Sequence, residues 1–132
     1  MLAWLLGEPA GEVVREILAA ADRVVTSDLT LVECDRALIR TQASGRLAEA
    51  AVIELRVRLN GAATGWDILR LDAEVIERAR RPFPREPLRT LDALHLASAL
   101  VAARVAERAT LLSLDARVRV AGRELGLIVV PE

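Results

Sequence analysis

The sequence contains neither tyrosine nor lysine. Its aromatic residues are confined to Trp4, Trp66 and Phe83, so the stacking by which proteins usually hold single-stranded bases is scarcely available. All 18 basic residues are arginine and the formal net charge is −1, which excludes the broad positive field that binds nucleic acid unaided. Arginine nevertheless suits bidentate contacts to phosphate.

Cysteine and long apolar runs are also scarce. Cys34 is the only cysteine, which excludes an internal disulfide or a zinc cluster and fits a reducing compartment. We expect its side chain to behave as a small buried hydrophobe. No apolar run approaches the roughly 18 residues of a membrane span, and no basic segment precedes the N-terminal LAWLL. The protein is therefore expected to be soluble and cytoplasmic, with no role at a membrane.

The apolar pattern predicts an α/β fold. Hydrophobic residues make up 53% of the 132 residues, enough for one domain with its own core over residues 1–132. Short apolar runs predict strands at Arg23–Thr26, Trp66–Leu71, Ala109–Leu114 and Leu127–Val130. Because helical patterns separate these runs, we expect a mostly parallel sheet covered by helices on both faces, a three-layer α/β/α sandwich.

Hydroxyl and carboxylate residues mark where the helices should begin. Ser27, Asp72 and Thr90 are candidate N-caps. The helices that follow them are predicted to reach about Thr41, Arg81 and Glu107, in that order. Asn60-Gly61 is expected to end a further helix.

Two carboxylates lie on apolar helix faces. Asp92 falls in the first turn of the helix after Thr90, and Leu96 and Ala99 share its side. Glu33 has Leu29 four residues before it and Ala37 four residues after it. A charge directed inward is costly unless it is paired or holds a metal.

A third acid, Asp115, follows the predicted strand Ala109–Leu114. Ligands of open parallel sheets gather outside the carboxyl ends of the strands, and we expect Glu33, Asp92 and Asp115 to converge there. Clustered carboxylates repel one another unless a cation joins them. Oxygen ligands suit Mg²⁺ or Mn²⁺, which can activate water for phosphoryl displacement.

Each of these residues also has a purely structural interpretation. Asp92 could complement the helix dipole, and Asp115 could cap the helix that follows it. Glu33 could pair with Arg36 or Arg40 on its own helix, and His95 is more typical of a core or rim residue than of a ligand. An arginine-rich segment borders three prolines and could be a solvated surface or a phosphate-contacting strip leading to Asp92. Its arginines are Arg78, Arg80, Arg81, Arg85 and Arg89.

Four stretches of the sequence resemble the PIN domain, and in particular the VapC-type toxins of bacterial toxin–antitoxin pairs. They are LAWLLGEP, VVTSDLTLVECDRAL, TLDALHLASAL and LLSLDARV followed by GLIVV. Together they run across nearly the whole chain. The combination of TLDALHLA with the T-x-x-E of Thr30–Glu33 is fairly specific for this family.

The resemblance implies a metal-dependent endoribonuclease that hydrolyses RNA at a ring of acids on Mg²⁺ or Mn²⁺. By motif, the family's second, third and fourth acids map onto Glu33, Asp92 and Asp115, and Ser113 matches a hydroxyl residue common near the last acid. Thr30, Arg85 and Arg89 are candidate substrate or supporting residues. The resemblance also implies a homodimer and inhibition by an antitoxin protein.

The sequence departs from the family at its start. PIN domains begin with an apolar strand that ends in the first metal-binding Asp, and no such strand precedes LAWLLGEP here. Either a segment upstream of Met1 completes the domain, which we favour because the other three acids remain, or the domain is a degenerate, non-catalytic module that binds protein or RNA. Without that strand and its Asp, the chain is expected to bind metal poorly.

Overall fold

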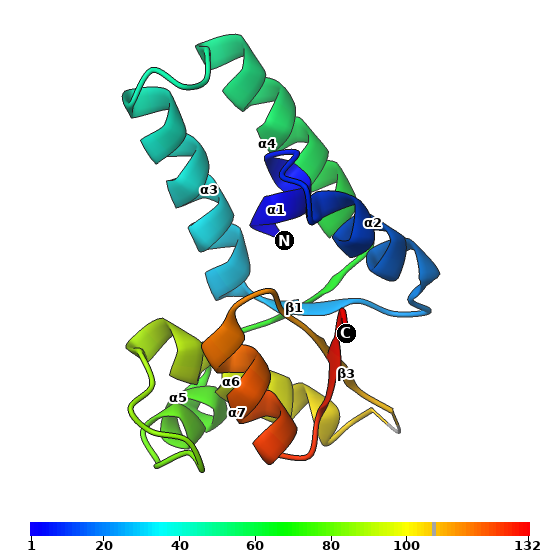
Figure 1. The fold of residues 1–132 in the computed structure, drawn as a ribbon, viewed down its shortest axis with the longest axis vertical. Helices are drawn as coiled ribbons and strands as arrows, with labels where there is room; N and C mark the ends of the chain where they lie inside the picture. Colours follow the sequence, from blue (N-terminus) through cyan, green and yellow to red (C-terminus); the bar gives the residue numbers. More distant parts are fainter. Residues whose placement is uncertain (107) are drawn as a thin grey trace. The chain divides into compact units, whose positions relative to one another are not determined.

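A computed structural model describes residues 1–106 and 108–132. The chain divides into two compact units, residues 1–68 (unit 1) and residues 69–132 (unit 2). The described residues form seven helices and four short strands (Figure 1). The predicted α/β class is confirmed, and within the described residues the strands form two two-stranded sheets, β1–β2 and β3–β4. None of the described helices is both long and apolar enough to cross a membrane.

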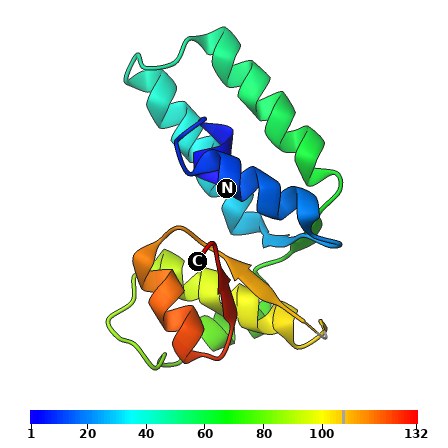
Figure 2. The ribbon, with the colours of Figure 1, turned by 45° about the vertical axis from the view of Figure 1, so that its right-hand side comes forward.

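Unit 1 is mainly helical. Its elements are α1 (Leu2–Leu5), α2 (Gly11–Ala20), β1 (Val25–Ser27), α3 (Asp28–Ala43), α4 (Glu49–Ala63) and β2 (Asp67–Leu69), the last of which ends on the first residue of unit 2. Helices α3 and α4 lie side by side as a hairpin (Figures 1 and 2). Between α1, α3 and α4 a core forms around Leu5, Cys34 and Leu38, each at most 1% exposed. The predicted burial of Cys34 is confirmed.

Unit 2 is built around a parallel strand pair. Its elements are α5 (Ala73–Ala79), α6 (Thr90–Ala103), β3 (Thr110–Leu112), α7 (Ala116–Glu124) and β4 (Ile128–Val130). The register of the pair runs from Thr110 opposite Ile128 to Leu112 opposite Val130. Helices α6 and α7 pack on each other, and α7 packs on β4 (Figure 2). Their core contains Val75, Phe83, Leu96, Ala97, Val118 and Ala121.

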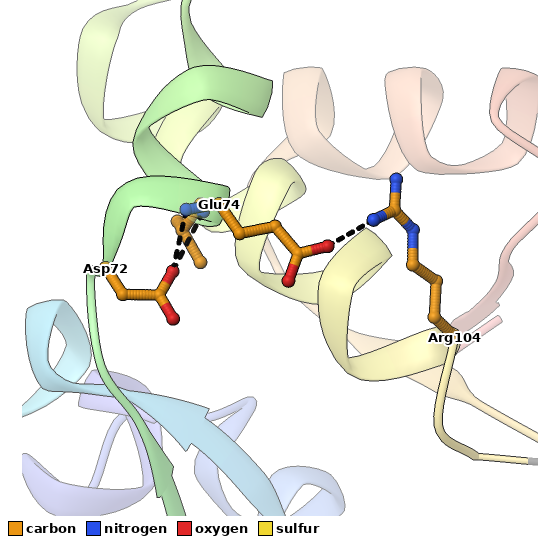
Figure 3. Close-up of polar contacts among 4 residues, drawn as sticks. Asp72, Glu74 and Arg104 are labelled. Carbon is orange, nitrogen blue, oxygen red and sulfur yellow. Dashed lines mark hydrogen bonds and ion pairs between the residues drawn. The ribbon is translucent and has the colours of Figure 1, made fainter.

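The start of α5 shows how local chemistry sets a helix boundary. The backbone N–H groups of Glu74 and Val75 donate to Asp72 Oδ1 over 3.0 and 3.1 Å, so Asp72 is the N-cap that the sequence predicts (Figure 3). The Glu74 carboxylate then forms an ion pair with Arg104, which follows α6. This pair links α5 to the end of α6 at an exposed site, where its contribution to stability is small.

Two predicted helix boundaries are wrong. Thr90 is already the first helical residue of α6, and Arg89, with an extended backbone, occupies the N-cap position without a side-chain cap bond. Gly61 lies inside α4 rather than at its end, because the cost of one glycine, about 1 kcal/mol, is small beside the burial of neighbours such as Leu59. Ser27 takes the N-cap position of α3, but its hydroxyl makes no cap bond. The predicted end of the Thr90 helix near Glu107 lies outside the described residues.

Candidate metal-binding site

Asp92 is the buried acid of unit 2. It lies in the first turn of α6 and is only 9% exposed, above the fully buried Leu96. Within the described residues, its Oδ2 atom is buried and has no hydrogen-bond partner. A carboxylate oxygen in that condition is unfavourable unless a cation or donor reaches it. The predicted inward direction of Asp92 is therefore confirmed.

Asp115 follows β3 and caps α7. The backbone N–H groups of Arg117 and Val118 donate to its Oδ1 over 2.8 and 3.2 Å. The capping role considered for Asp115 is thus real, and it uses a single carboxylate oxygen. Asp115 is exposed and the cap engages Oδ1 alone, so capping does not prevent this carboxylate from binding a cation.

The turn before Asp115 is held by side chains. The backbone N–H of Asp115 donates to Ser113 Oγ over 3.2 Å. Arg119, one turn into α7, donates from Nη1 to the Ser113 carbonyl oxygen over 2.8 Å and from Nη2 to the Pro131 carbonyl oxygen over 2.5 Å. Arg119 was not among the predicted site residues. Its position four residues after Asp115 on a predicted helix was the available signal, but its carbonyl partners depend on the pairing of β3 with β4.

Glu33 and Thr30 belong to unit 1. Both are half-buried and lie one turn apart on α3. Leu29 and Ala37, the neighbours of Glu33 along the same helix face, are 9% and 6% exposed. The predicted apolar stripe around Glu33 is therefore confirmed.

The chemistry of the acids fits a hard divalent cation. Carboxylate oxygens are the ligands that Mg²⁺ and Mn²⁺ prefer, and the unpartnered Oδ2 of Asp92 is suited to accept one. Asp92 and Asp115 come from unit 2 and Glu33 from unit 1. Inside either unit, the described part of the chain holds no group of three His, Cys, Asp or Glu side chains that could bind a metal.

The Glu86 carboxylate accepts two backbone hydrogen bonds within the arginine-rich segment after α5. The backbone N–H groups of Phe83 and Leu88 donate to the two carboxylate oxygens of Glu86 over 3.1 and 2.7 Å. These donors hold the pKa of Glu86 below its usual range. The guanidinium of Arg78 stacks on the Phe83 ring at 4.1 Å from its centroid. The segment is thus a fixed surface of unit 2.

The arginines of this segment differ in their availability. Arg85 donates to Glu124 over 3.3 Å, and Arg80 donates to Glu77 over 2.8 Å. Among the described residues, no carboxylate pairs with Arg81 or Arg89. Arg89 immediately precedes α6, three residues before Asp92. Of the two arginines predicted to contact substrate, Arg89 is therefore the one with an uncommitted side chain.

A shallow groove of about 610 Å³ runs along this segment. The end of α5, the proline segment and the first turns of α6 form its walls. The floor is apolar, with Phe83, Leu88 and Ala93, and the rim carries Arg80, Arg81 and Thr90. Asp92 does not line the groove, although Thr90, Ala93 and Leu94 of the same helix do.

Comparison with known proteins identifies the family to which this chain belongs. The sequence profile of the PIN domain matches residues 1–124. The chain belongs to the PIN domain family, as its motifs indicated.

Its relatives include named ribonucleases. Ribonuclease VapC35 of Mycobacterium tuberculosis, from strains CDC 1551 / Oshkosh and ATCC 25618 / H37Rv, is 37% identical over 108 residues, which cover 82% of this chain and 72% of the relative. Ribonuclease VapC46 of Mycobacterium tuberculosis strain ATCC 25618 / H37Rv is 33% identical over 123 residues, which cover 93% of this chain and 85% of the relative.

Proposed function

We propose that this chain is an endoribonuclease that hydrolyses RNA phosphodiester bonds, and that it is the toxin of a toxin–antitoxin pair. The relatives that carry the name ribonuclease support the reaction class. The observation in this chain that carries the proposal is the buried, unpartnered Oδ2 of Asp92, because a carboxylate oxygen in that state is unfavourable until a cation or a hydrogen-bond donor reaches it.

The proposed metal ligands are Glu33, Asp92 and Asp115, and the proposed metal is Mg²⁺ or Mn²⁺. When bound, such an ion activates water and neutralises charge on the scissile phosphate. Asp92 supplies a carboxylate oxygen shielded from solvent. Asp115 supplies the oxygen that its cap leaves unused, and the cap fixes the direction of that oxygen.

Four further residues are proposed to support the substrate or the acids. Arg89 contacts an RNA phosphate near Asp92, because its guanidinium is uncommitted and lies at the start of the same helix. Arg85 adds positive charge to the arginine-rich segment while it is paired with Glu124. Ser113 orients Asp115 through the backbone N–H that it accepts. Thr30 lies one turn before Glu33 and supports it.

Partners follow from the same proposal. We propose RNA as substrate, an antitoxin protein as inhibitor and a homodimer as the assembled form, with residues 1–132 acting as one PIN domain. Exposed apolar side chains on α3 and α4, such as Val32, Ile53 and Val57, at 55%, 56% and 67% exposure, are compatible with a partner surface. A cytoplasmic site of action is proposed on the same basis.

The direct experiment is an RNA cleavage assay with purified protein. A mixed pool of labelled RNA is incubated with Mn²⁺, with Mg²⁺ or with EDTA, and a form that includes any in-frame codons before Met1 is assayed alongside. Cleavage with either ion and none with EDTA is expected. RNA binding without cleavage in any condition would instead support a non-catalytic module, and equal cleavage in EDTA would refute the metal dependence.

A further inference from the structure

Arg119 makes contacts that the proposed cleavage reaction does not itself require. Its guanidinium bridges two carbonyl oxygens, one just after β3 and one just after β4, over 2.8 and 2.5 Å. The last paired residues of these strands are Leu112 and Val130. Arg119 therefore continues the connection between the strands beyond the point where their register ends. It is half-buried, and hydrogen bonds from a charged donor are among the stronger ones in proteins.

Three hydrogen bonds hold Ser113, and Arg119 makes one of them. Its N–H donates to the Val130 carbonyl oxygen over 3.1 Å, its carbonyl oxygen accepts from Arg119, and its hydroxyl oxygen accepts from the Asp115 N–H. Two residues later, Asp115 has Oδ1 fixed by the first turn of α7. Asp115 is thus held at its carboxylate by the first turn of α7 and at its backbone N–H by Ser113.

We propose that Arg119 is a positioning residue for the metal site: it locks the end of β3 so that Asp115 presents Oδ2 in one direction before a cation arrives. The inference rests on the proposed function, because the site it serves is the proposed one. Residues that orient metal ligands typically change metal affinity 10–100-fold when they are removed. Arginine is needed because its planar fork reaches two acceptors at once, whereas lysine carries a single ammonium group.

A direct contact between Arg119 and the RNA phosphate is the competing interpretation. Both terminal nitrogens of Arg119 already donate to carbonyl oxygens, which favours positioning over substrate contact. The two interpretations differ in one observable quantity. A positioning residue changes Mn²⁺ affinity in the absence of RNA, whereas a phosphate-contacting residue changes only the kinetics with RNA.

The test is a Mn²⁺ titration followed by electron paramagnetic resonance on the full chain without RNA, for wild type, Arg119→Met, Arg119→Lys and Arg123→Met. Arg123 lies on the same helix and is exposed, so it is the matched control. We expect affinity to fall about 10-fold or more in Arg119→Met, to fall less in Arg119→Lys and to stay within about twofold in Arg123→Met. Exchange of the Ser113 and Asp115 amide hydrogens, measured by NMR, should quicken in Arg119→Met.

Each outcome of these measurements supports or overturns the positioning role of Arg119. A folded Arg119→Met that binds Mn²⁺ as wild type does, or that changes only RNA kinetics, overturns the proposal. If Arg119→Met does not fold, unchanged affinity in Arg119→Lys overturns it. If wild type binds no Mn²⁺, either as this chain or in a form that includes any in-frame codons before Met1, the proposed metal site fails. The amide exchange rates then still show whether Arg119 holds Asp115, so the two failures are distinguishable.

Discussion

Gly11 of α2 and Ala3 of α1 approach each other so closely that a Cβ atom on Gly11 would overlap the Ala3 carbonyl oxygen. The same atom would come within 2.9 Å of Trp4 Cα. Both neighbours are backbone atoms and cannot move aside as a side chain could. The contact therefore fixes how α1 and α2 pack within unit 1, and only glycine is compatible with it.

Gly11→Ala is expected to lower the free energy of unfolding by about 1–3 kcal/mol, because the added methyl group forces the two helices apart. Urea denaturation followed by circular dichroism measures the change. Gly61→Ala is the matched control, since Gly61 lies inside α4 with nothing within 4 Å of the added carbon. It should raise stability by about 0.5–1 kcal/mol. A neutral or stabilising Gly11→Ala would show that the close approach is wrong.

The burial of Cys34 predicts a loss of stability at alkaline pH. Burial raises the pKa of its thiol to about 11, against an ordinary value of 9.0. Between these values the unfolded chain has released a proton that the folded chain retains, so the free energy of unfolding falls as pH rises from about 9 to 11. The full effect is of the order of 2–3 kcal/mol. Lysine and tyrosine, whose side chains ordinarily titrate in this pH range, are absent from the sequence.

Urea unfolding at several pH values between 8 and about 11 measures this slope. Cys34→Ala is the control: it should be less stable throughout, because it leaves a cavity in the core of unit 1, but it should lack the slope. A wild-type stability that stays level across this range would mean that Cys34 is more accessible than the structure indicates.

Much of this arrangement could be predicted from the sequence, where the signal is local. Helical spacing predicts the apolar stripe beside Glu33 and the inward direction of Asp92, and a carboxylate before a helical pattern predicts Asp72 as a cap. Thr90 has the chemistry of a cap, yet the helix begins one residue earlier, because backbone geometry rather than side-chain type decides the boundary. The contacts of Arg119 join segments far apart in the chain and could not be predicted from spacing.

Asp92 should make stability depend on metal. Its buried, unpartnered oxygen is unfavourable without a cation. In EDTA, Asp92→Asn is expected to be more stable than wild type by about 1 kcal/mol, the loss of a helix-dipole contact being smaller than the relief of the buried charge. Mn²⁺ at about 100 times its dissociation constant should add about 2.7 kcal/mol to wild type alone. Thermal unfolding with and without Mn²⁺ checks both statements, and equal stabilisation of the variant would contradict them.

Arg89 should matter for RNA binding and little for stability. Arg89→Ala removes a guanidinium that no described residue pairs with, so KM for RNA is expected to rise several-fold and the salt dependence of binding to decrease. Arg15→Ala is the control, since Arg15 is exposed and pairs with Glu12 on α2. Cleavage kinetics at two salt concentrations separate the effects. The same KM for both variants would mean that Arg89 does not contact the RNA.

If Asp92 holds the metal at which RNA is cleaved, the most direct measurement is RNA cleavage by wild type and Asp92→Asn at saturating Mn²⁺. The two proteins are compared at equal folded fraction, verified by circular dichroism. Wild type is expected to cleave RNA, and the variant is expected to lose at least about 100-fold in cleavage rate while it keeps its fold. Cleavage by folded Asp92→Asn at the wild-type rate would contradict this role of Asp92.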